Sequence, residues 1–335
     1  MKQSLVIQVP QACWTQALLD GKVKVDSFPV VFEPSVFDRQ TSKRLRGEVE
    51  EKYAGTEQVL TDLIVRISRG NEPDLTALPI FVTRGMVHRK LVMRRGPLGP
   101  KDLGGRLIGM GRVLGATSVF LRGLLKDEFG VERSQARWMA AEPITSDGAM
   151  DGEWRYLTQR GGCPASELLS WLAADKLDAL IYPGGAGGHW FNWVSEGTAS
   201  PSPDPYGDLE AIVQKNPALR FPIGDLESHL QWFRRNRIYP LYHCLAVRRE
   251  IAEAGRSLCA ALVAAFDQAA AKAFDYMNDS ERSLCRRETE LLGVDVNRCG
   301  LTPLHRRTVE KCIDYLEADG LLPRRPTIDE IFPFG

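Results

Sequence analysis

The chain has 335 residues, of which 44% are hydrophobic and 26% are charged, so it carries enough apolar mass for one large or two medium cores. This composition excludes disorder as the dominant state. Lys plus Arg and Asp plus Glu both number 43, and with no net charge we expect neither nucleic acid nor a membrane as a partner.

The N-terminal segment predicts a strand. Residues 4–9 are a short β-branched run without the long apolar segment and small-residue cleavage site of a signal peptide. The longest strongly apolar stretch, residues 258–266, is less than half of the ~20 residues that cross a bilayer. We therefore expect a cytoplasmic protein.

Strands and helices alternate along the chain. Short β-branched runs predict strands at residues 4–9, 30–32, 76–81, 90–93, 107–110, 137–140 and 177–182. Longer periodic segments predict helices near 15–20, 47–69, 116–129, 166–176, 250–277 and 302–320, the last two as a C-terminal helical layer. Residues 146–162 and 198–206 predict loops over or beside a cleft. This order indicates an α/β fold.

The seven cysteines are scattered and form no C-x-x-C pair, which argues against a disulfide framework and a structural zinc site. We expect reduced, mostly buried thiols. Cys244 beside His243 is an alternative candidate for a nucleophile. Adjacent residues on a strand point to opposite faces, however, which disfavours that pairing.

Several short motifs occur in the order that is typical of a known fold. The segments at 18–23, 78–81 and 102–109, together with Arg84 and His88, resemble the type 2 periplasmic-binding-protein fold. Four further segments resemble the 4,5-dihydroxyphthalate decarboxylase family, and they are Arg-Gly-Leu-Leu-Lys-Asp-Glu-Phe-Gly-Val at 122–131, Leu-Asp-Ala-Leu-Ile at 177–181, Ile-Tyr-Pro-Leu-Tyr-His at 238–243 and Gly-Leu-Leu-Pro-Arg-Arg at 320–325. The resemblance covers nearly the whole chain.

The resemblance implies a two-lobed α/β fold with a ligand cleft between the lobes. Lobe 1 would comprise residues 1–88 and 245–335, and lobe 2 residues 89–244, with crossing strands near 88–93 and 243–248. The chain departs from the family pattern at 9–14, 58–61 and 115–116, where ligand contacts are expected. These departures leave open a substrate other than 4,5-dihydroxyphthalate.

Decarboxylation of a phenolic ring requires a base, an acid and an anion clamp. A base takes the phenolic proton, an acid protonates the carboxylated ring carbon, and carbon dioxide then leaves. Acid and base groups typically contribute ~10²–10⁴-fold each. The reaction needs no electron-sink cofactor, and we expect none. A divalent ion held by His88, His243 and Glu57 stays an open alternative.

His88 and His243 are the predicted proton carriers. The chain has five histidines, and these two fall at the expected crossings and match the family pattern. Histidine has an ordinary pKa of ~6.5, which suits either role near neutral pH. Which histidine is the acid stays open, and so does the alternative of two hinge histidines bonded to backbone.

Glu57 matches a family position at a predicted helix or loop edge, where it would orient a histidine or accept a phenolic proton. Arg84 would hold a substrate carboxylate with a two-pronged donor. The alternative for Glu57 is a solvated carboxylate on a helix, and the alternative for Arg84 is a surface salt bridge.

Further substrate contacts are expected from two segments. Arg237 ends the run of residues 234–237 and precedes Tyr239, and both are candidates. A glycine-rich segment after a predicted strand, residues 182–190, carries His189 and Trp190, and its backbone N–H groups would cradle an anion. A purely structural turn is the alternative there.

The sequence thus predicts a cytoplasmic carboxy-lyase acting on a small hydroxylated aromatic carboxylate. One alternative is a binding protein that closes on a small carboxylate without chemistry. Another is a different lyase on the same scaffold, resembling the menaquinone-pathway lyases or the thiamine pyrimidine synthase. Assembly as a homodimer is also left open.

Overall fold

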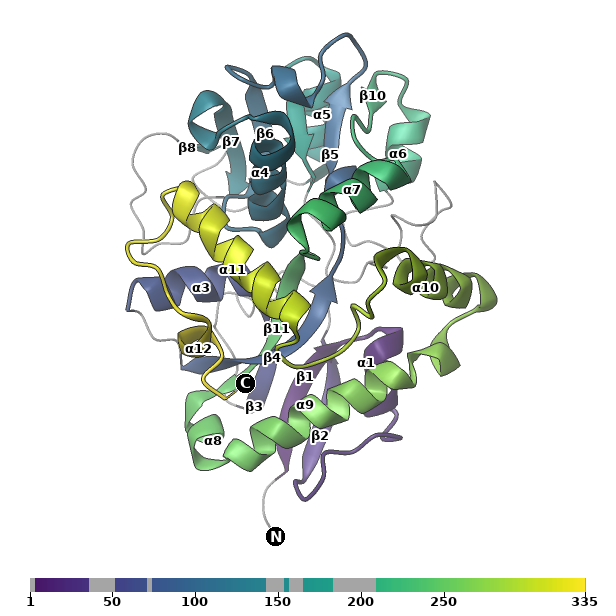
Figure 1. Cartoon of the computed structure of the whole chain (residues 1–335), viewed down its shortest axis with the longest axis vertical. Coiled ribbons are helices and arrows are strands. Elements are labelled where there is room, and N and C mark those ends of the chain that lie inside the picture. The colour runs from purple at the N-terminus through teal and green to yellow at the C-terminus, as the bar shows by residue number, and fades with distance from the viewer. Residues whose placement is uncertain are drawn as a thin grey trace. The chain divides into compact units, whose positions relative to one another are not determined.

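The computed structural model describes residues 4–35, 52–70, 74–142, 154–156, 165–182 and 209–334. The chain forms two compact units (Figure 1). Unit 1 consists of Met1–Arg84, Arg237–Ile313 and Leu322–Gly335, and unit 2 of Gly85–Asn236 and Asp314–Leu321. The lobe boundaries expected from the sequence lie after residues 88 and 244.

Among its described residues, unit 1 contains a five-stranded sheet in the order β2-β1-β3-β11-β4. Its strands are β1 (Leu5–Pro10), β2 (Val30–Ser35), β3 (Tyr53–Val59), β4 (Leu75–Arg84) and β11 (Leu241–Arg248). Strand β1 runs parallel to β2 and β3, whereas β11 runs antiparallel to β3 and β4. Every residue of β3 and β4 is buried, so both faces of these strands are covered.

The helix predicted at residues 47–69 is wrong over residues 53–59, which form strand β3. Residues 47–51 lie outside the described residues, and in the rest of this range the structure has a strand at Tyr53–Val59 and a helix, α3, at Leu60–Ser68. Pairing with β1 and β11 outweighs the local helix propensity of this segment. Gly55 lies so close to β11 that a Cβ there would be 2.8 Å from the carbonyl oxygen of Ala246. Glu57 was predicted at a helix or loop edge, and this placement is wrong, because Glu57 lies buried on a central strand.

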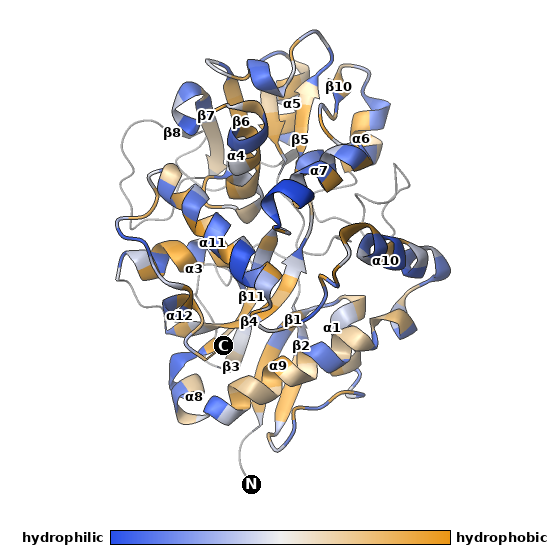
Figure 2. Cartoon of the chain, in the orientation of Figure 1, coloured by the Kyte–Doolittle hydropathy of each residue, from blue (hydrophilic) through white to orange (hydrophobic). Residues whose placement is uncertain are grey.

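The helices of unit 1 begin with α1 (Cys13–Leu19), which packs with α9 (Arg256–Ala271) against the sheet. Their shared apolar cluster includes Ile7, Val82, Leu245, Leu262 and Phe266. Besides α3, further helices among the described residues of unit 1 are α8 (Arg249–Ala254), the 3₁₀ helix η5 (Ala273–Tyr276), α10 (Asp279–Leu292) and α12 (Ile328–Ile331). Figure 2 shows mainly apolar strands, whereas α10 is mostly hydrophilic.

Among its described residues, unit 2 contains a six-stranded sheet in the order β10-β5-β9-β6-β7-β8. Its strands are β5 (Leu91–Arg94), β6 (Leu107–Arg112), β7 (Arg137–Glu142), β8 (Trp154–Tyr156), β9 (Ala179–Ile181) and β10 (Leu219–Arg220). Strand β6 runs parallel to β7 and β9, and β5 runs antiparallel to β9 and β10. The predicted loop at 146–162 thus contains the short strand β8, and the loop at 198–206 lies outside the described residues.

The described part of unit 2 contains the helices α4 (Ala116–Phe129), α5 (Ala165–Ala173), α6 (Leu209–Lys215) and α7 (Leu226–Asn236). Short 3₁₀ helices occur at His88–Lys90 (η1), Pro100–Asp102 (η2) and Arg133–Gln135 (η3). Helix α4 has the bounds predicted from the sequence, and Gly130 ends it in the left-handed conformation at φ 67°. None of the helices in the described part of the chain has the length and apolar character needed to cross a membrane.

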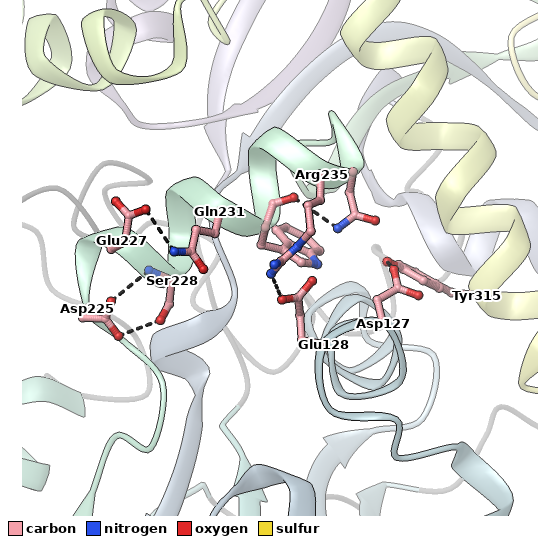
Figure 3. A network of polar contacts seen from close by, with 10 residues as sticks. Asp127, Glu128, Asp225, Glu227, Ser228, Gln231, Arg235 and Tyr315 are labelled. Atoms are coloured by element: carbon pink, nitrogen blue, oxygen red, sulfur yellow. Dashed lines mark hydrogen bonds and ion pairs between the residues drawn. The ribbon is translucent and has the colours of Figure 1, made fainter.

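Helix α11 (Pro303–Ala318) contributes to both units. Its residues up to Ile313 belong to unit 1, and those from Asp314 belong to unit 2. Within unit 2, the Tyr315 hydroxyl donates to Asp127 at 2.6 Å, and Arg235 of α7 pairs with Glu128 (Figure 3). Asp319 accepts a buried hydrogen bond from Arg122 Nε at 2.7 Å. The end of α11 is therefore fixed to α4.

Candidate functional site

A histidine and a carboxylate meet on two central strands of unit 1. The register of β3 and β11 pairs His243 with Val59 and Leu245 with Glu57. The His243 Nδ1 atom lies 3.2 Å from Glu57 Oε2. Glu57 is 1% exposed, whereas the His243 side chain is 13% exposed. An ionised carboxylate only accepts hydrogen bonds, so Nδ1 donates and neutral His243 keeps its lone pair on Nε2.

A serine contacts the other oxygen of this carboxylate. Ser35, the last residue of β2, donates from Oγ to Glu57 Oε1 at 3.1 Å. The main chain of Glu57 is held as well, because the buried Gln58 amide donates to its carbonyl oxygen at 2.9 Å. Three strands thus place a serine, a glutamate and a histidine in one hydrogen-bonded chain. Ser35 carries no motif in the sequence, and sequence reasoning missed it.

Arg84 ends strand β4 and lies inside unit 1, with 3% exposure. Its Nη1 donates to the carbonyl oxygen of Phe81 at 3.0 Å, and its Nη2 donates to Asn297 Oδ1 at 3.0 Å. Burial lowers the pKa of the Arg84 guanidinium, while nearby groups, Glu288 among them, oppose that shift. The geometry joins the end of β4 to the loop before α11, and the predicted contact of Arg84 with a carboxylate stays a prediction.

The two candidates next to β11 differ in burial. Tyr239 is 1% exposed, and its hydroxyl donates to Glu288 Oε1 at 2.6 Å. Its backbone N–H donates to Thr308 Oγ1 at 3.1 Å. Arg237 is exposed and takes a left-handed backbone conformation, with φ 53°. Tyr239 is thus part of the interior of unit 1, and the substrate contacts predicted for both residues stay predictions.

His88 lies in unit 2, at the start of η1, and is 2% exposed. Its ring centroid is 4.2 Å from that of His229 and 5.2 Å from that of Trp232. Burial lowers the pKa of His88 well below its ordinary value, and His229 adds to this shift. The Nδ1 atom of His88 has no hydrogen-bond partner in the part of the chain that the structure describes. The imidazole is therefore neutral near pH 7.

His229 is the partner of His88 that sequence reasoning missed. Its Nδ1 lies 2.7 Å from the carbonyl oxygen of Asp225, so this nitrogen carries the proton. Burial lowers the pKa of His229 to about 4. In the sequence His229 lies on a predicted helix far along the chain from His88, and no motif marks it.

The structure brings together part of the predicted set. Glu57 and His243 are hydrogen-bonded in unit 1, which also contains Arg84 and Tyr239. His88 belongs to unit 2, and its meeting with His243 stays a prediction. His189 and Trp190 lie outside the described residues.

Unit 1 also contains a cavity of about 610 Å³, which is lined by Trp14, Phe274, Cys285, Asn297 and other residues. This volume is typical of small-molecule sites.

The structure does not favour Cys244 as a nucleophile. Desolvation raises the pKa of the buried Cys244 thiol to about 12, so it does not supply the thiolate that a nucleophile needs. No group of three or more His, Cys, Asp and Glu side chains suited to a metal ion occurs among the described residues.

Solved structures define the class of fold. The chain resembles the periplasmic aliphatic sulphonate binding protein SsuA from Escherichia coli, with a TM-score of 0.54 and 11% identity over 99% of this chain and 92% of that one. It also resembles a periplasmic sulfonate-binding protein SsuA from Methylobacillus flagellatus, with a TM-score of 0.55 and 11% identity over 98% and 91%. The predicted periplasmic-binding-protein-like α/β fold is confirmed.

The sequence comparison gives relatives with a named enzyme activity. The chain is 25% identical to the 4,5-dihydroxyphthalate decarboxylase of Comamonas testosteroni over 99% of this chain and 96% of that protein. It is 26% identical to the enzyme of the same name from Pseudomonas putida over 54% and 71%. No family model matches the chain. The resemblance to the 4,5-dihydroxyphthalate decarboxylase family seen in the motifs is therefore confirmed.

Proposed function

We propose that this chain is a decarboxylase that removes a carboxylate from a hydroxylated aromatic acid such as 4,5-dihydroxyphthalate. The proposal is supported by the whole-length similarity to the Comamonas testosteroni decarboxylase. The observation that carries the chemistry is the hydrogen bond of 3.2 Å between Glu57 and His243. Such a pair presents a basic nitrogen whose positive form is stabilised by a buried carboxylate.

His243 is the base in this scheme. Its Nε2 takes the proton from the phenol para to the carboxylated carbon, while Nδ1 stays bonded to Glu57. The phenolate electron pair moves into the ring, and the carboxylated carbon gains a proton. The bond from that carbon to the carboxylate then breaks, carbon dioxide leaves, and the electron pair restores aromaticity and returns to the phenol oxygen, which takes its proton back from His243. Glu57 stabilises the imidazolium without itself taking the proton.

His88 is the proposed acid for the ring carbon. Burial keeps its imidazole neutral near pH 7, so only the small protonated fraction can donate, and that imidazolium is a stronger acid than that of an exposed histidine. A strong acid suits protonation of carbon. We keep Arg237, His189 and Trp190 as proposed substrate contacts. The scheme uses no metal ion, and activity that disappears with a chelator and returns with a divalent ion would instead favour the metal alternative.

The direct test is incubation with 4,5-dihydroxyphthalate and detection of carbon dioxide and the monocarboxylate by mass spectrometry. We expect the wild-type chain to release carbon dioxide. His243→Gln and Glu57→Gln should lower kcat by roughly 10²–10⁴-fold, the range of acid–base contributions. Glu330→Gln serves as the matched control for Glu57→Gln, because Glu330 is an exposed helix-capping residue of α12. Full activity in His243→Gln would remove this residue from the mechanism.

A second candidate function is binding without chemistry. It is favoured by the similarity in fold to the sulfonate-binding proteins. In that case an aromatic carboxylate would bind at equilibrium and be recovered unchanged after long incubation. Calorimetry combined with mass analysis of the ligand separates the two functions.

A further inference from the structure

The cavity of about 610 Å³ in unit 1 does not include the Glu57–His243 pair. Its described lining residues come from α1, α9, η5, α10 and the segments that follow η5 and α10, and all of them belong to unit 1. A space of this size holds a small organic molecule. The cavity is therefore a candidate for a second ligand site, and its side chains decide which class of ligand fits.

Part of the cavity wall is apolar and aromatic. Trp14 and Met277 are buried, with 8% and 6% exposure, and Phe274 is half-buried. Ala270 and Ala273 also line this space. Aromatic and thioether side chains suit the ring of an aromatic ligand.

Two side chains of the lining supply hydrogen-bond donors. The Arg286 guanidinium lies over the Phe274 ring, 5.3 Å from its centroid, and forms no ion pair within the described part of the chain. The Oδ1 atom of Asn297 accepts a hydrogen bond from Arg84. Its Nδ2 atom lies 3.9 Å from the Cys285 sulfur, which is a weak acceptor. Arg286 and Asn297 are therefore able to donate to a carboxylate.

The cavity also carries an excess of acidic side chains. Its described lining contains two arginines and three acidic residues, and one of each, Arg298 and Asp267, pair at 3.1 Å. Glu290 lies one turn after Arg286 on α10, but no ion pair joins them. Asp295 accepts a backbone N–H at 2.8 Å and forms no ion pair among the described residues. A ligand with only a carboxylate would meet these acids, whereas an added ammonium group would pair with them.

We propose that this cavity binds a free α-amino acid with an aromatic side chain. The carboxylate accepts hydrogen bonds from Arg286 and Asn297. The ammonium group pairs with Glu290 and Asp295. The ring of the ligand packs against the aromatic wall that includes Trp14. A zwitterion matches both signs of charge in the lining, and its binding does not depend on the decarboxylase assignment.

Isothermal titration calorimetry on the full chain tests the class of ligand. L-Phenylalanine carries all three groups, whereas 3-phenylpropionate lacks the ammonium group, phenethylamine lacks the carboxylate and L-alanine lacks the ring. We expect L-phenylalanine to bind at millimolar concentration or below. Each of the other three compounds should bind at least about fivefold more weakly, which for the charged groups is the effect of one exposed ion pair.

Variants of the lining test the place of binding. Arg286→Gln should weaken the binding of L-phenylalanine at least about fivefold and remove its advantage over phenethylamine. The double variant Glu290→Gln, Asp295→Asn should remove its advantage over 3-phenylpropionate. Arg306→Gln is the matched control, because Arg306 is an exposed arginine of α11 that does not line the cavity.

His243→Gln separates this site from the proposed catalytic one, and it should keep the wild-type affinity for L-phenylalanine. Three outcomes would overturn the proposal. They are no binding of L-phenylalanine to the wild type, equal binding of L-phenylalanine and 3-phenylpropionate, and binding that is lost in His243→Gln but kept in Arg286→Gln. None of these measurements uses decarboxylation, so a failure of the decarboxylase assignment would leave them unchanged.

Discussion

The ring of Tyr315 packs so closely on Gly123 of helix α4 that a Cβ at position 123 would overlap it. The ring is held on two sides, by an edge contact with Phe120 and by the hydrogen bond from its hydroxyl to Asp127 at 2.6 Å. Glycine inside a helix costs about 1 kcal/mol relative to alanine. In α4 this cost is offset by the close approach of the aromatic ring.

Gly123→Ala should therefore destabilise unit 2 despite the better helix propensity of alanine. We expect the free energy of unfolding to fall by about 1–3 kcal/mol, the usual cost of overpacking. Urea denaturation followed by circular dichroism measures it. Gly104→Ala is the matched control, because no atom lies within 4 Å of a Cβ at that position. Equal stability of Gly123→Ala and the wild type would contradict the packing argument.

Gly55→Ala should disturb both stability and the Glu57–His243 pair. The added Cβ would meet the Ala246 carbonyl oxygen at 2.8 Å, and this backbone atom is fixed in the sheet. Strand β3 must then move away from β11, and Glu57 with it. We expect a loss of at least ~1 kcal/mol in unfolding free energy and a fall in activity measured below the unfolding temperature. An unchanged kcat in the folded variant would show that the strand spacing does not control the pair.

Tyr239→Phe should act on stability rather than on substrate binding. The variant removes the hydroxyl that donates to the buried Glu288 at 2.6 Å. Leaving such an acceptor without this donor costs about 1–3 kcal/mol. We expect a lower denaturation midpoint and a KM within about twofold of the wild type. A large increase in KM with unchanged stability would instead support the substrate contact predicted from the sequence.

The stability of the protein should fall as the pH drops from about 6.5 to about 4. Burial lowers the pKa of His229 and of His305 to about 4 and that of His88 well below its ordinary value. The unfolded chain takes up protons at these histidines near pH 6.5, whereas the folded chain does not, so acid favours unfolding. Each pKa unit corresponds to about 1.4 kcal/mol, so His229 alone contributes up to ~3 kcal/mol.

Urea midpoints measured at pH 7.5, 6 and 5 test this expectation. His229→Gln removes one of the buried imidazoles and should flatten the pH dependence, although it also lowers stability at neutral pH. The Asp225 carbonyl oxygen, which faces His229 Nδ1, is retained in the variant. Midpoints that do not change between pH 7.5 and 5 would contradict the assignment of neutral buried histidines.

The elements that were predicted correctly are marked by patterns in their own local sequence. Helix α4 has an apolar stripe and a C-terminal glycine, and its bounds at residues 116 and 129 match the prediction. Strand β3 has polar residues such as Thr56, Glu57 and Gln58 at buried positions, so its pattern does not alternate. Its strand character comes from pairing with β1 and β11, which no local pattern encodes.

The site was accessible to sequence reasoning only where a family motif marked it. The resemblance pointed to His243 and Glu57, and the structure has the two side chains hydrogen-bonded. Ser35 is 22 residues from Glu57 and has no motif, so only the register of the sheet reveals it. The stacking of His229 on His88 likewise depends on the fold of unit 2.

The way the chain is divided between the units has a consequence for synthesis on the ribosome. Strand β11 lies between β3 and β4, so the sheet of unit 1 has a gap until residues 241–248 have emerged. Unit 2 is likewise incomplete until Tyr315 and Asp319 have emerged, because these residues near the end of α11 form hydrogen bonds with α4. Nascent chains shorter than about 320 residues therefore expose unfinished cores, and chaperones have a long interval in which to bind them.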